Sequence, residues 1–221
     1  KTVLAYSSIS QMGIIMVGVG AGLTQPEAWE GILAAVLIYA VHHGLAKGAL
    51  FLGVAFAHPA GDPPAMLWTR IGLVIPALAL AGAPFTSGAV AKLALKGEIA
   101  VLPEAWVDWV SFLIPLLAIG TTLIMARFLW LVWPSTYAPT EPAVARMRLS
   151  WAFLVVTTVV GVWLLPGALA RVPMMLTAEM LWKATWPLLL GGAIAWLGVK
   201  LRQRYQTWRL PGIPAGDMVV W

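Results

Sequence analysis

Apolar residues run along most of this chain in stretches of about 20 or more, separated by short segments rich in Pro, Gly and charged residues. An α-helix needs about 20 apolar residues to cross the hydrocarbon core of a bilayer, and such punctuation marks helix ends. The pattern predicts an all-α integral membrane protein. Its six expected spanning helices cover residues 3–22, 27–57, 67–97, 105–133, 148–165 and 181–204, before a tail at 205–221.

The third of these stretches is interrupted near its middle by Pro84 and Gly88. Proline removes a backbone hydrogen bond and clashes with the preceding helical turn, so we expect one broken helix over 67–97. Irregular backbone at membrane depth is tolerated where it lines a cavity or packs against protein.

The composition agrees with a membrane location and excludes several function classes. Hydrophobic residues make up 61% of the chain and charged residues 10%, far from the values of soluble domains. The net charge of +5 comes without a basic run interleaved with aromatics, so we predict no nucleic-acid partner. The chain has no cysteine, and its three histidines come without clustered carboxylates. We therefore predict no metal and no cofactor, since nucleotide, haem and cluster motifs are also missing.

Charged residues between the stretches indicate the orientation. If the connecting segments alternate between the two sides, the side of both termini receives nine basic and three acidic residues, and the other side three basic and six acidic. The positive-inside rule then places both termini and the 205–221 tail in the cytoplasm. Splitting residues 67–97 into two full spans would mix the basic residues across both sides, which favours a single broken span.

Two lysines, Lys47 and Lys92, are left in the middle of apolar stretches. An ionisable group at this depth costs about 2.5–3.5 kcal/mol on insertion scales and is by default a functional-site hypothesis. Tyr39, His43 and Lys47 follow one another at intervals of four, so they share a helix face and with intervening water could relay protons. The alternative is structural: Lys47 snorkels, or it bonds to a carbonyl and holds helices together.

Lys92 lies one turn beyond the predicted break, where we expect the positive N-terminal end of the second half-helix to lie close to it. Arg127 falls near a helix end, which fits an interfacial position as well as a pathway role. His42 points about 100° away from His43 and is either a packed neutral histidine or a relay member.

Three segments of the chain carry a family resemblance: KTVLAYSSISQMG at 1–13, HHGLAKGALFLGVA at 42–55 and ALALAGAPFTSGAVAKLAL at 77–95. In sequence, order and spacing they resemble the antiporter-like subunits shared by respiratory complex I, membrane-bound hydrogenases and Mrp-type sodium/proton antiporters. The resemblance covers about the C-terminal 40 to 45% of such a subunit. It implies the second half of an inverted-repeat fold.

The resemblance also implies roles for individual residues. Lys47 corresponds to the central-axis lysine of the family, and His43 to the histidine four residues before it. Lys92 corresponds to the lysine or glutamate beside the broken helix, at the proton exit. Lys1 corresponds to a basic residue that precedes the Leu-Ala-Tyr-Ser-Ser segment. Arg127 resembles an arginine near the end of the following span, whereas Gln11 and Tyr39 stand where many or some members have histidine.

These observations predict proton or cation/proton translocation within a multisubunit complex of a prokaryotic-type inner membrane. The first inverted repeat of the family lies upstream of Lys1, so we expect a fragment or a split-gene product whose partners include that repeat and other membrane subunits. A NADH:quinone oxidoreductase-like or hydrogenase complex is the first hypothesis, with no redox site on this chain. A Mrp-type Na⁺/H⁺ antiporter and a non-conducting scaffold remain alternatives.

Overall fold

The computed structural model describes residues 2–57, 63–134 and 142–204, with side chains from residue 147 in the last range. The described part is built from helices and contains no strand. Six of its helical segments are long and apolar enough to cross a membrane, which confirms an all-α integral membrane protein. The helices are α1 (Thr2–Thr24), η1 (Pro26–Ala28), α2 (Trp29–Ala57), α3 (Pro63–Ala81), α4 (Ser87–Ile99), α5 (Glu104–Val132), α6 (Pro142–Val160), η2 (Gly161–Leu164), η3 (Leu169–Arg171), α7 (Val172–Met175) and α8 (Ala178–Arg204).

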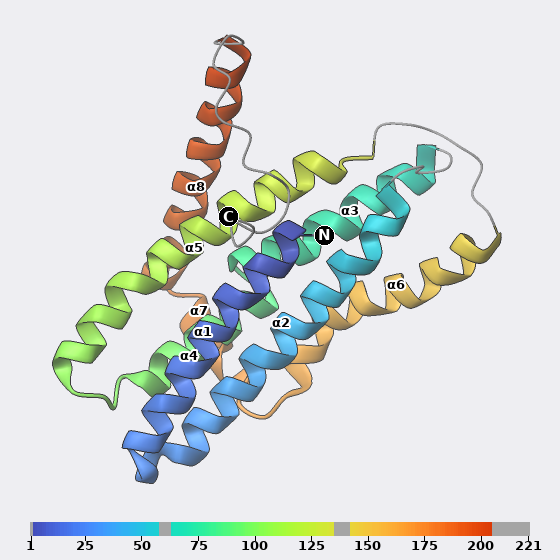
Figure 1. Ribbon diagram of the computed structural model, residues 1–221. Helices are drawn as coiled ribbons and strands as arrows, with labels where there is room; N and C mark the ends of the chain where they lie inside the picture. Colours follow the sequence, from blue (N-terminus) through green and yellow to red (C-terminus); the bar gives the residue numbers. More distant parts are fainter. Residues whose placement is uncertain (1, 58–62, 135–141, 205–221) are drawn as a thin grey trace, which may run out of the picture.

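Helix α2 is the centre of the molecule, and α1, α3, α4 and α6 pack around it (Figure 1). Its buried side chains belong to two apolar clusters. One contains Ile32 and Ile38 near the start of α2 and packs against α4 and η2, and the other contains Leu50 and Phe56 near its end and packs against α3, α5 and α6. The polar residues of α2 lie where these two clusters meet.

Trp151 anchors α6 to α2 and α3. Its indole nitrogen donates a hydrogen bond of 2.8 Å to the carbonyl of Ala49 in α2, and its ring packs against Phe56. Two glycines make room for the ring, because a Cβ at Gly53 or Gly72 would lie 2.9 Å or less from an indole atom. The hydrogen bond and the packing of the indole ring together hold α6 against α2 and α3.

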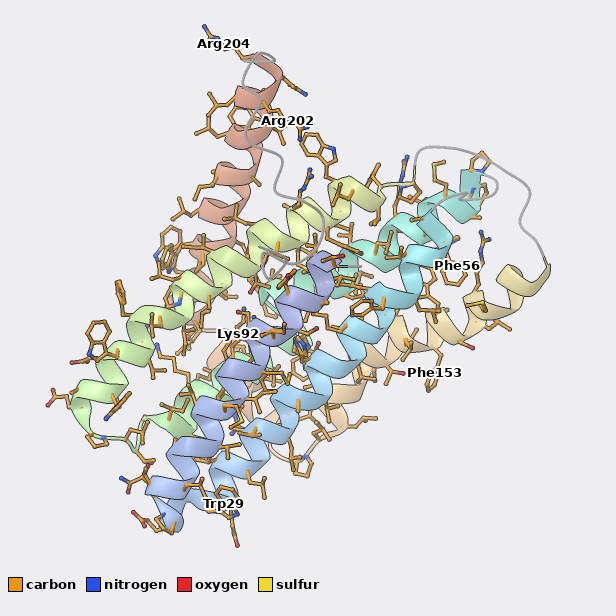
Figure 2. All side chains as sticks on the ribbon, in the orientation of Figure 1. Trp29, Phe56, Lys92, Phe153, Arg202 and Arg204 are labelled. Atoms are coloured by element: carbon orange, nitrogen blue, oxygen red, sulfur yellow. The ribbon has the colours of Figure 1, made fainter. Side chains whose placement is uncertain are left out.

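Helices α5 and α8 form the outer part of the bundle (Figure 1). α5 contacts α1 and α3, whereas α8 packs mainly along α5 and leans away from the remaining helices. The two cross closely at Gly191, where an added Cβ would lie 2.8 Å from Thr122 and 3.1 Å from the carbonyl of Ile119. Figure 2 shows Arg202 and Arg204 at the free end of α8, and Trp29 at the opposite end of the molecule.

The predicted break is confirmed, and it separates α3 from α4. Gly82 ends α3 with a φ of +87°, and its N–H bonds back to the carbonyls of Leu78 and Ala79, a left-handed ending that favours glycine. Pro84 lies in the connecting turn, and Thr86 caps α4 through a 3.4 Å bond from the N–H of Ala89 to its hydroxyl oxygen.

Gly88 has a different function from the one its sequence position suggested. It lies inside the first turn of α4 rather than in the turn itself, and a Cβ there would come within 1.8 Å of the carbonyl oxygen of Ala79. The residue therefore allows the two half-helices to approach one another, while Gly82 makes the turn.

Candidate functional site

The three polar residues predicted on one face of α2 are all buried. Tyr39, His43 and Lys47 expose 2%, 5% and 4% of their surfaces. Their spacing of one helical turn places them along one stripe of α2. The first and the last residue of this stripe, Tyr39 and Lys47, each form a hydrogen bond with α1. Three polar groups in one apolar helix are therefore enclosed by protein.

Lys47 is bound to the backbone of α1. Its ammonium donates a hydrogen bond of 2.7 Å to the carbonyl oxygen of Leu4, a residue with no exposed surface. The same carbonyl accepts a bond of 3.1 Å from the hydroxyl of Ser8. Lys47 thus forms the bond to a carbonyl that we expected if its role is to hold helices together. If Lys47 also relays protons, it does so from this hydrogen-bonded position.

Tyr39 begins a chain of hydrogen bonds that links three helices. Its hydroxyl donates to Oε1 of Gln11 in α1 at 2.5 Å, and Nε2 of Gln11 donates to the hydroxyl of Thr121 in α5 at 3.2 Å. Thr121 in turn donates to the carbonyl of Leu117 at 2.7 Å. Sequence reasoning noted Gln11 only as a departure from the resembling family and did not find Thr121, because their meeting depends on helix packing.

His43 lies between Tyr39 and Lys47 on α2, and its environment differs from theirs. Both ring nitrogens are buried, and neither has a hydrogen-bond partner among the described residues. Buried polar atoms in proteins are nearly always paired, often with water. Of the three groups on this stripe, His43 is therefore the one that forms no hydrogen bond through its side chain with the described part of the chain.

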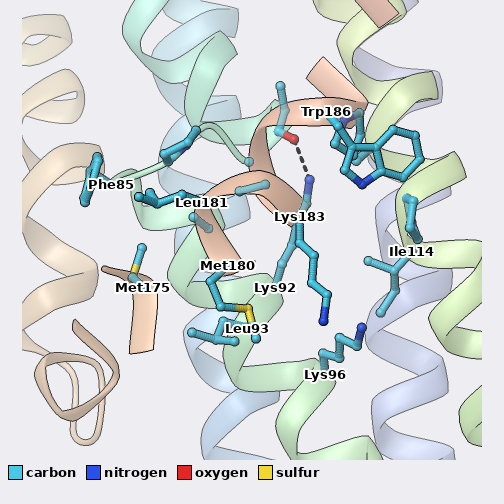
Figure 3. A pocket seen from close by; sticks show the side chains of 18 of the residues that line it. Phe85, Lys92, Leu93, Lys96, Ile114, Met175, Met180, Leu181, Lys183 and Trp186 are labelled. Carbon is cyan, nitrogen blue, oxygen red and sulfur yellow. Dashed lines mark hydrogen bonds between the residues drawn. The ribbon is translucent and has the colours of Figure 1, made fainter. Parts of the chain in front are cut away.

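Lys92 lies in the second turn of α4 and reaches back across the break. Its ammonium donates a hydrogen bond of 2.6 Å to the carbonyl of Ala81, the last residue of α3 (Figure 3). The sequence placed the positive end of the second half-helix next to this lysine. The structure instead places the ammonium at the negative C-terminal end of the first half-helix, which favours a positive charge.

A small cavity joins Lys92 to the hydrogen-bonded chain of Tyr39. Gln11, Tyr39, Thr121 and Lys92 all line it, and its volume of about 20 Å³ is enough for a single water molecule. The cavity thus connects Tyr39 of α2 with Lys92 beside the break, although the two residues are 53 positions apart in sequence.

Lys92 also lines a second, larger cavity of about 280 Å³ between α4, α5, α7 and α8 (Figure 3). The walls are mostly apolar, and two further lysines, Lys96 and Lys183, reach into it (Figure 3). Lys183 pairs with Glu179 one turn earlier in α8. Lys92 and Ile114 line both the narrow internal cavity and this wider one, and Lys92 is the ionisable residue of the two.

His42 belongs to the break rather than to the face of Tyr39 and Lys47. It is 3% exposed, and its Nδ1 lies 2.9 Å from the hydroxyl oxygen of Ser87, the first residue of α4. The contact connects α2 directly to the start of the second half-helix. Both readings of His42 from the sequence, packed histidine and relay member, are compatible with this position.

Two other predicted residues are not part of this cluster. Arg127 is exposed and lines a groove between α5 and α8, and Lys1 lies outside the described residues. Within the described ranges, no group of three His, Asp or Glu side chains converges in a way that could hold a metal ion.

Comparison with known proteins identifies the family. Residues 1–124 match the model described as NADH:quinone oxidoreductase/Mrp antiporter, transmembrane, and this is more than half of the chain. The chain belongs to this family. The matched region contains Tyr39, His43, Lys47, Lys92 and the break, so the expected membership is confirmed, and with it a multi-pass membrane protein of antiporter-like type.

The curated relatives are named as antiporter subunits. Proteins that carry the name antiporter subunit mnhA2 are 38% identical in Staphylococcus saprophyticus and 37% identical in Staphylococcus aureus MRSA252, over 110 residues in each case. The matched region covers 42% of this chain and 14% of each relative. The chain thus aligns with only a small part of these longer proteins. No solved structure matches it at a significant level.

Proposed function

We propose that this chain carries one half of a proton path in a cation/proton antiporter-like membrane subunit. The observation that supports it most directly is the continuity of polar groups between Tyr39 and Lys92 through a cavity of about 20 Å³. Expensive buried charges combined with a connected polar route are typical of ion pathways.

In the proposed mechanism, Lys47 accepts and releases a proton at the centre of the bundle. Burial in an apolar environment disfavours the charged ammonium, so its protonation responds to charges that arrive nearby. His43 is the neighbouring group with two free ring nitrogens, and bound water would connect it with Lys47. Interactions between charges in a weakly screened interior reach several kcal/mol, which is enough to drive such a transfer.

The proton then passes from the hydroxyl of Tyr39 to Lys92 through water in the small cavity that both residues line, while Gln11 and Thr121 hold the hydroxyl of Tyr39 in position. The hydroxyl of Tyr39 and the amide of Gln11 form part of a hydrogen-bonded line, and a water in the small cavity would complete it. Lys92 releases the proton into the cavity of about 280 Å³ beside the break. That cavity is bordered by α7 and the start of α8, so we propose that release occurs on the side opposite the termini.

Between redox-driven pumping and gradient-driven antiport, the names of the curated relatives favour antiport. We propose exchange of a monovalent cation such as Na⁺ for protons, with a NADH:quinone oxidoreductase-like complex as the second candidate. The family model includes both classes, and the buried lysines serve either one.

The partners and location are likewise proposed from the family. The chain aligns with 14% of the length of its relatives. We propose that it functions with the first inverted repeat, either upstream on the same polypeptide or on another subunit. We propose a complex in a prokaryotic plasma membrane, since the relatives are bacterial. We place both termini in the cytoplasm, because the side of the termini receives nine basic residues and the other side three, and the positive-inside rule counts basic residues.

The test is proton transport by the complete complex in liposomes, followed with an internal pH dye after a sodium or redox jump. Lys47→Gln keeps a hydrogen-bond donor for Leu4 and removes the titratable charge. Transport should fall to the level of empty liposomes. Lys92→Gln should have the same effect, since it acts on the same path.

Lys200→Gln provides the matched control, because it makes the same chemical change at an exposed site in α8. It should transport at the wild-type rate. If the two buried variants assemble and transport normally, the proposal is wrong and the scaffold alternative is favoured. If Lys47→Gln fails to assemble, Lys47 has a structural role, and Lys47→Arg, which keeps the charge and the donors, is then tested. A Lys47→Arg complex that assembles but does not transport protons supports the proton path, and one that assembles and transports normally contradicts it.

A further inference from the structure

A groove between α5 and α8 contains an unusual combination of residues. It has a volume of about 320 Å³ and is lined by Arg127 and Trp130 of α5 and by Trp196 and Arg202 of α8, over an apolar floor that includes Val199. No carboxylate is among its lining residues. The groove is separate from the cavities that border Lys92.

The helix crossing explains why the groove exists. α5 and α8 touch closely at Gly191 and Thr122, and α8 then leans away from the bundle toward its end (Figure 1). Their side chains therefore separate progressively beyond the crossing, and the space opens toward Arg202. Figure 2 shows Arg202 near the free end of α8. The end of a spanning helix is the part that lies at the membrane–water interface.

The charges of this region are all of one sign. From residue 109 to the end of α5, and from residue 184 to the end of α8, the sequence has no Asp or Glu. The described salt bridges are elsewhere, at Glu98 and Glu179. Arg127 and Arg202 thus face the groove without a counter-charge among its lining residues.

We propose that this groove binds an anionic phospholipid, with the phosphate between Arg127 and Arg202 and an acyl chain along the apolar floor. Arginine binds phosphate oxygens with two parallel hydrogen bonds, and basic pockets between membrane helices are suited to acidic headgroups. Trp130 and Trp196 are 49% and 63% exposed, as is usual for aromatic residues at the headgroup level. A soluble anion would leave the apolar floor uncovered.

The site adds a ligand to this part of the molecule and gives Arg127 a function other than proton transfer. The ammonium nitrogen of Lys200 lies 5.9 Å from the ring centroid of Trp196. Trp196 lines the groove. A bound lipid would fill the space between α5 and α8 beyond their crossing. It would thus hold α8 against the rest of the bundle.

The experiment uses a phosphatidylglycerol with a photoreactive group on its acyl chain, in membranes that contain the complete protein in its complex. After illumination, mass spectrometry maps the labelled peptides. Labelling should occur on residues 123–130 and 195–199, and unlabelled phosphatidylglycerol should displace the probe where phosphatidylcholine does not. Arg127→Gln and Arg202→Gln should each raise the half-saturating lipid concentration about five-fold.

Arg204→Gln is the matched control, because it removes an exposed arginine of the same helix that does not line the groove. It should leave labelling unchanged, and Arg127→Lys with Arg202→Lys, which keeps both charges, should stay close to wild type. Labelling that phosphatidylcholine displaces equally, that survives the double glutamine variant, or that is replaced by a cross-link to a neighbouring subunit would overturn the proposal.

Discussion

The two buried lysines are held in similar ways but in different surroundings. Lys47 and Lys92 each donate to one backbone carbonyl, that of Leu4 at 2.7 Å and that of Ala81 at 2.6 Å. Lys47 is 4% exposed and is enclosed by α1 and the second apolar cluster. Lys92 is only partly buried and borders two cavities. The proposed roles of Lys47 as central relay and Lys92 as release group need this difference in access.

The two carbonyls differ as well. Leu4 lies within α1, where its carbonyl faces the N–H of Ser8 and also accepts from the Ser8 hydroxyl. Ala81 ends α3, and carbonyls in a last turn have no partner within their helix. Lys92 therefore supplies a bond that the break would otherwise leave unmade, whereas Lys47 adds a third donor to a carbonyl that is already paired.

The largest effect is expected from a change that forces the two half-helices apart beside the break. Gly88→Ala would place a methyl group 1.8 Å from the carbonyl oxygen of Ala79, a backbone atom that a rotamer change cannot move. We expect destabilisation of about 3 kcal/mol or more, with poor recovery of the folded complex. Thermal unfolding of the purified complex measures it.

Gly97→Ala is the control for this prediction, since it lies in the same helix with no other atom within 4 Å of the added Cβ. Alanine is the better helix former by about 1 kcal/mol, so this variant should be as stable as wild type or more stable. Equal effects of the two substitutions would show that α3 and α4 do not meet at Gly88.

The next prediction compares how much each of the two lysines contributes to the stability of the complex. Lys92→Met should destabilise the complex by about 1–3 kcal/mol, because the Ala81 carbonyl loses its donor. Lys47→Met should leave stability unchanged or raise it, because Leu4 keeps its bond from Ser8 and an expensive buried charge is removed. Thermal midpoints of both variants in one detergent give the comparison. Equal destabilisation by the two would contradict it.

The predicted fold depended on local information and was accurate for that reason. The length of an apolar run indicates a spanning helix, and Pro84 with Gly88 indicated the break. The division of labour between Gly82 and Gly88 was not predictable in the same way. One needs a left-handed backbone and the other needs space next to Ala79, and both requirements arise only when the half-helices are packed.

The candidate site was predictable along one helix but not between helices. The interval of four placed Tyr39, His43 and Lys47 on one face, because helical periodicity is a property of the sequence. The partner of Tyr39 is Gln11 in another helix, and that of His42 is Ser87 at the break. These contacts follow from crossing angles and rotation of helices, for which a single sequence carries no direct signal.

A smaller effect is expected at the link between the two lysine environments. Tyr39→Phe removes the donor to Gln11 but leaves its amide bond to Thr121. We expect a loss of about 1 kcal/mol, together with slower proton transport, because the line toward Lys92 is interrupted. The loss should disappear in a Gln11→Leu background, where Tyr39 has no partner to lose. Additive losses in the double variant would argue against a shared bond.

The smallest effect is expected at the cap of the second half-helix. Thr86 accepts a long bond of 3.4 Å from Ala89, so Thr86→Ala should cost about 0.5 kcal/mol, the lower end for an N-cap. Because the first turn of α4 holds Ser87 against His42, its fraying should speed amide hydrogen exchange at residues 87–90 while residues 4–8 beside Lys47 exchange as before. Thr24→Ala, which removes only a bond to the carbonyl of Ala21 at the end of α1, should leave exchange at both sites unchanged. Faster exchange around Leu4 in the Thr86 variant would mean that the two lysines share one opening unit, and the contrast in their access would then belong to the resting state alone.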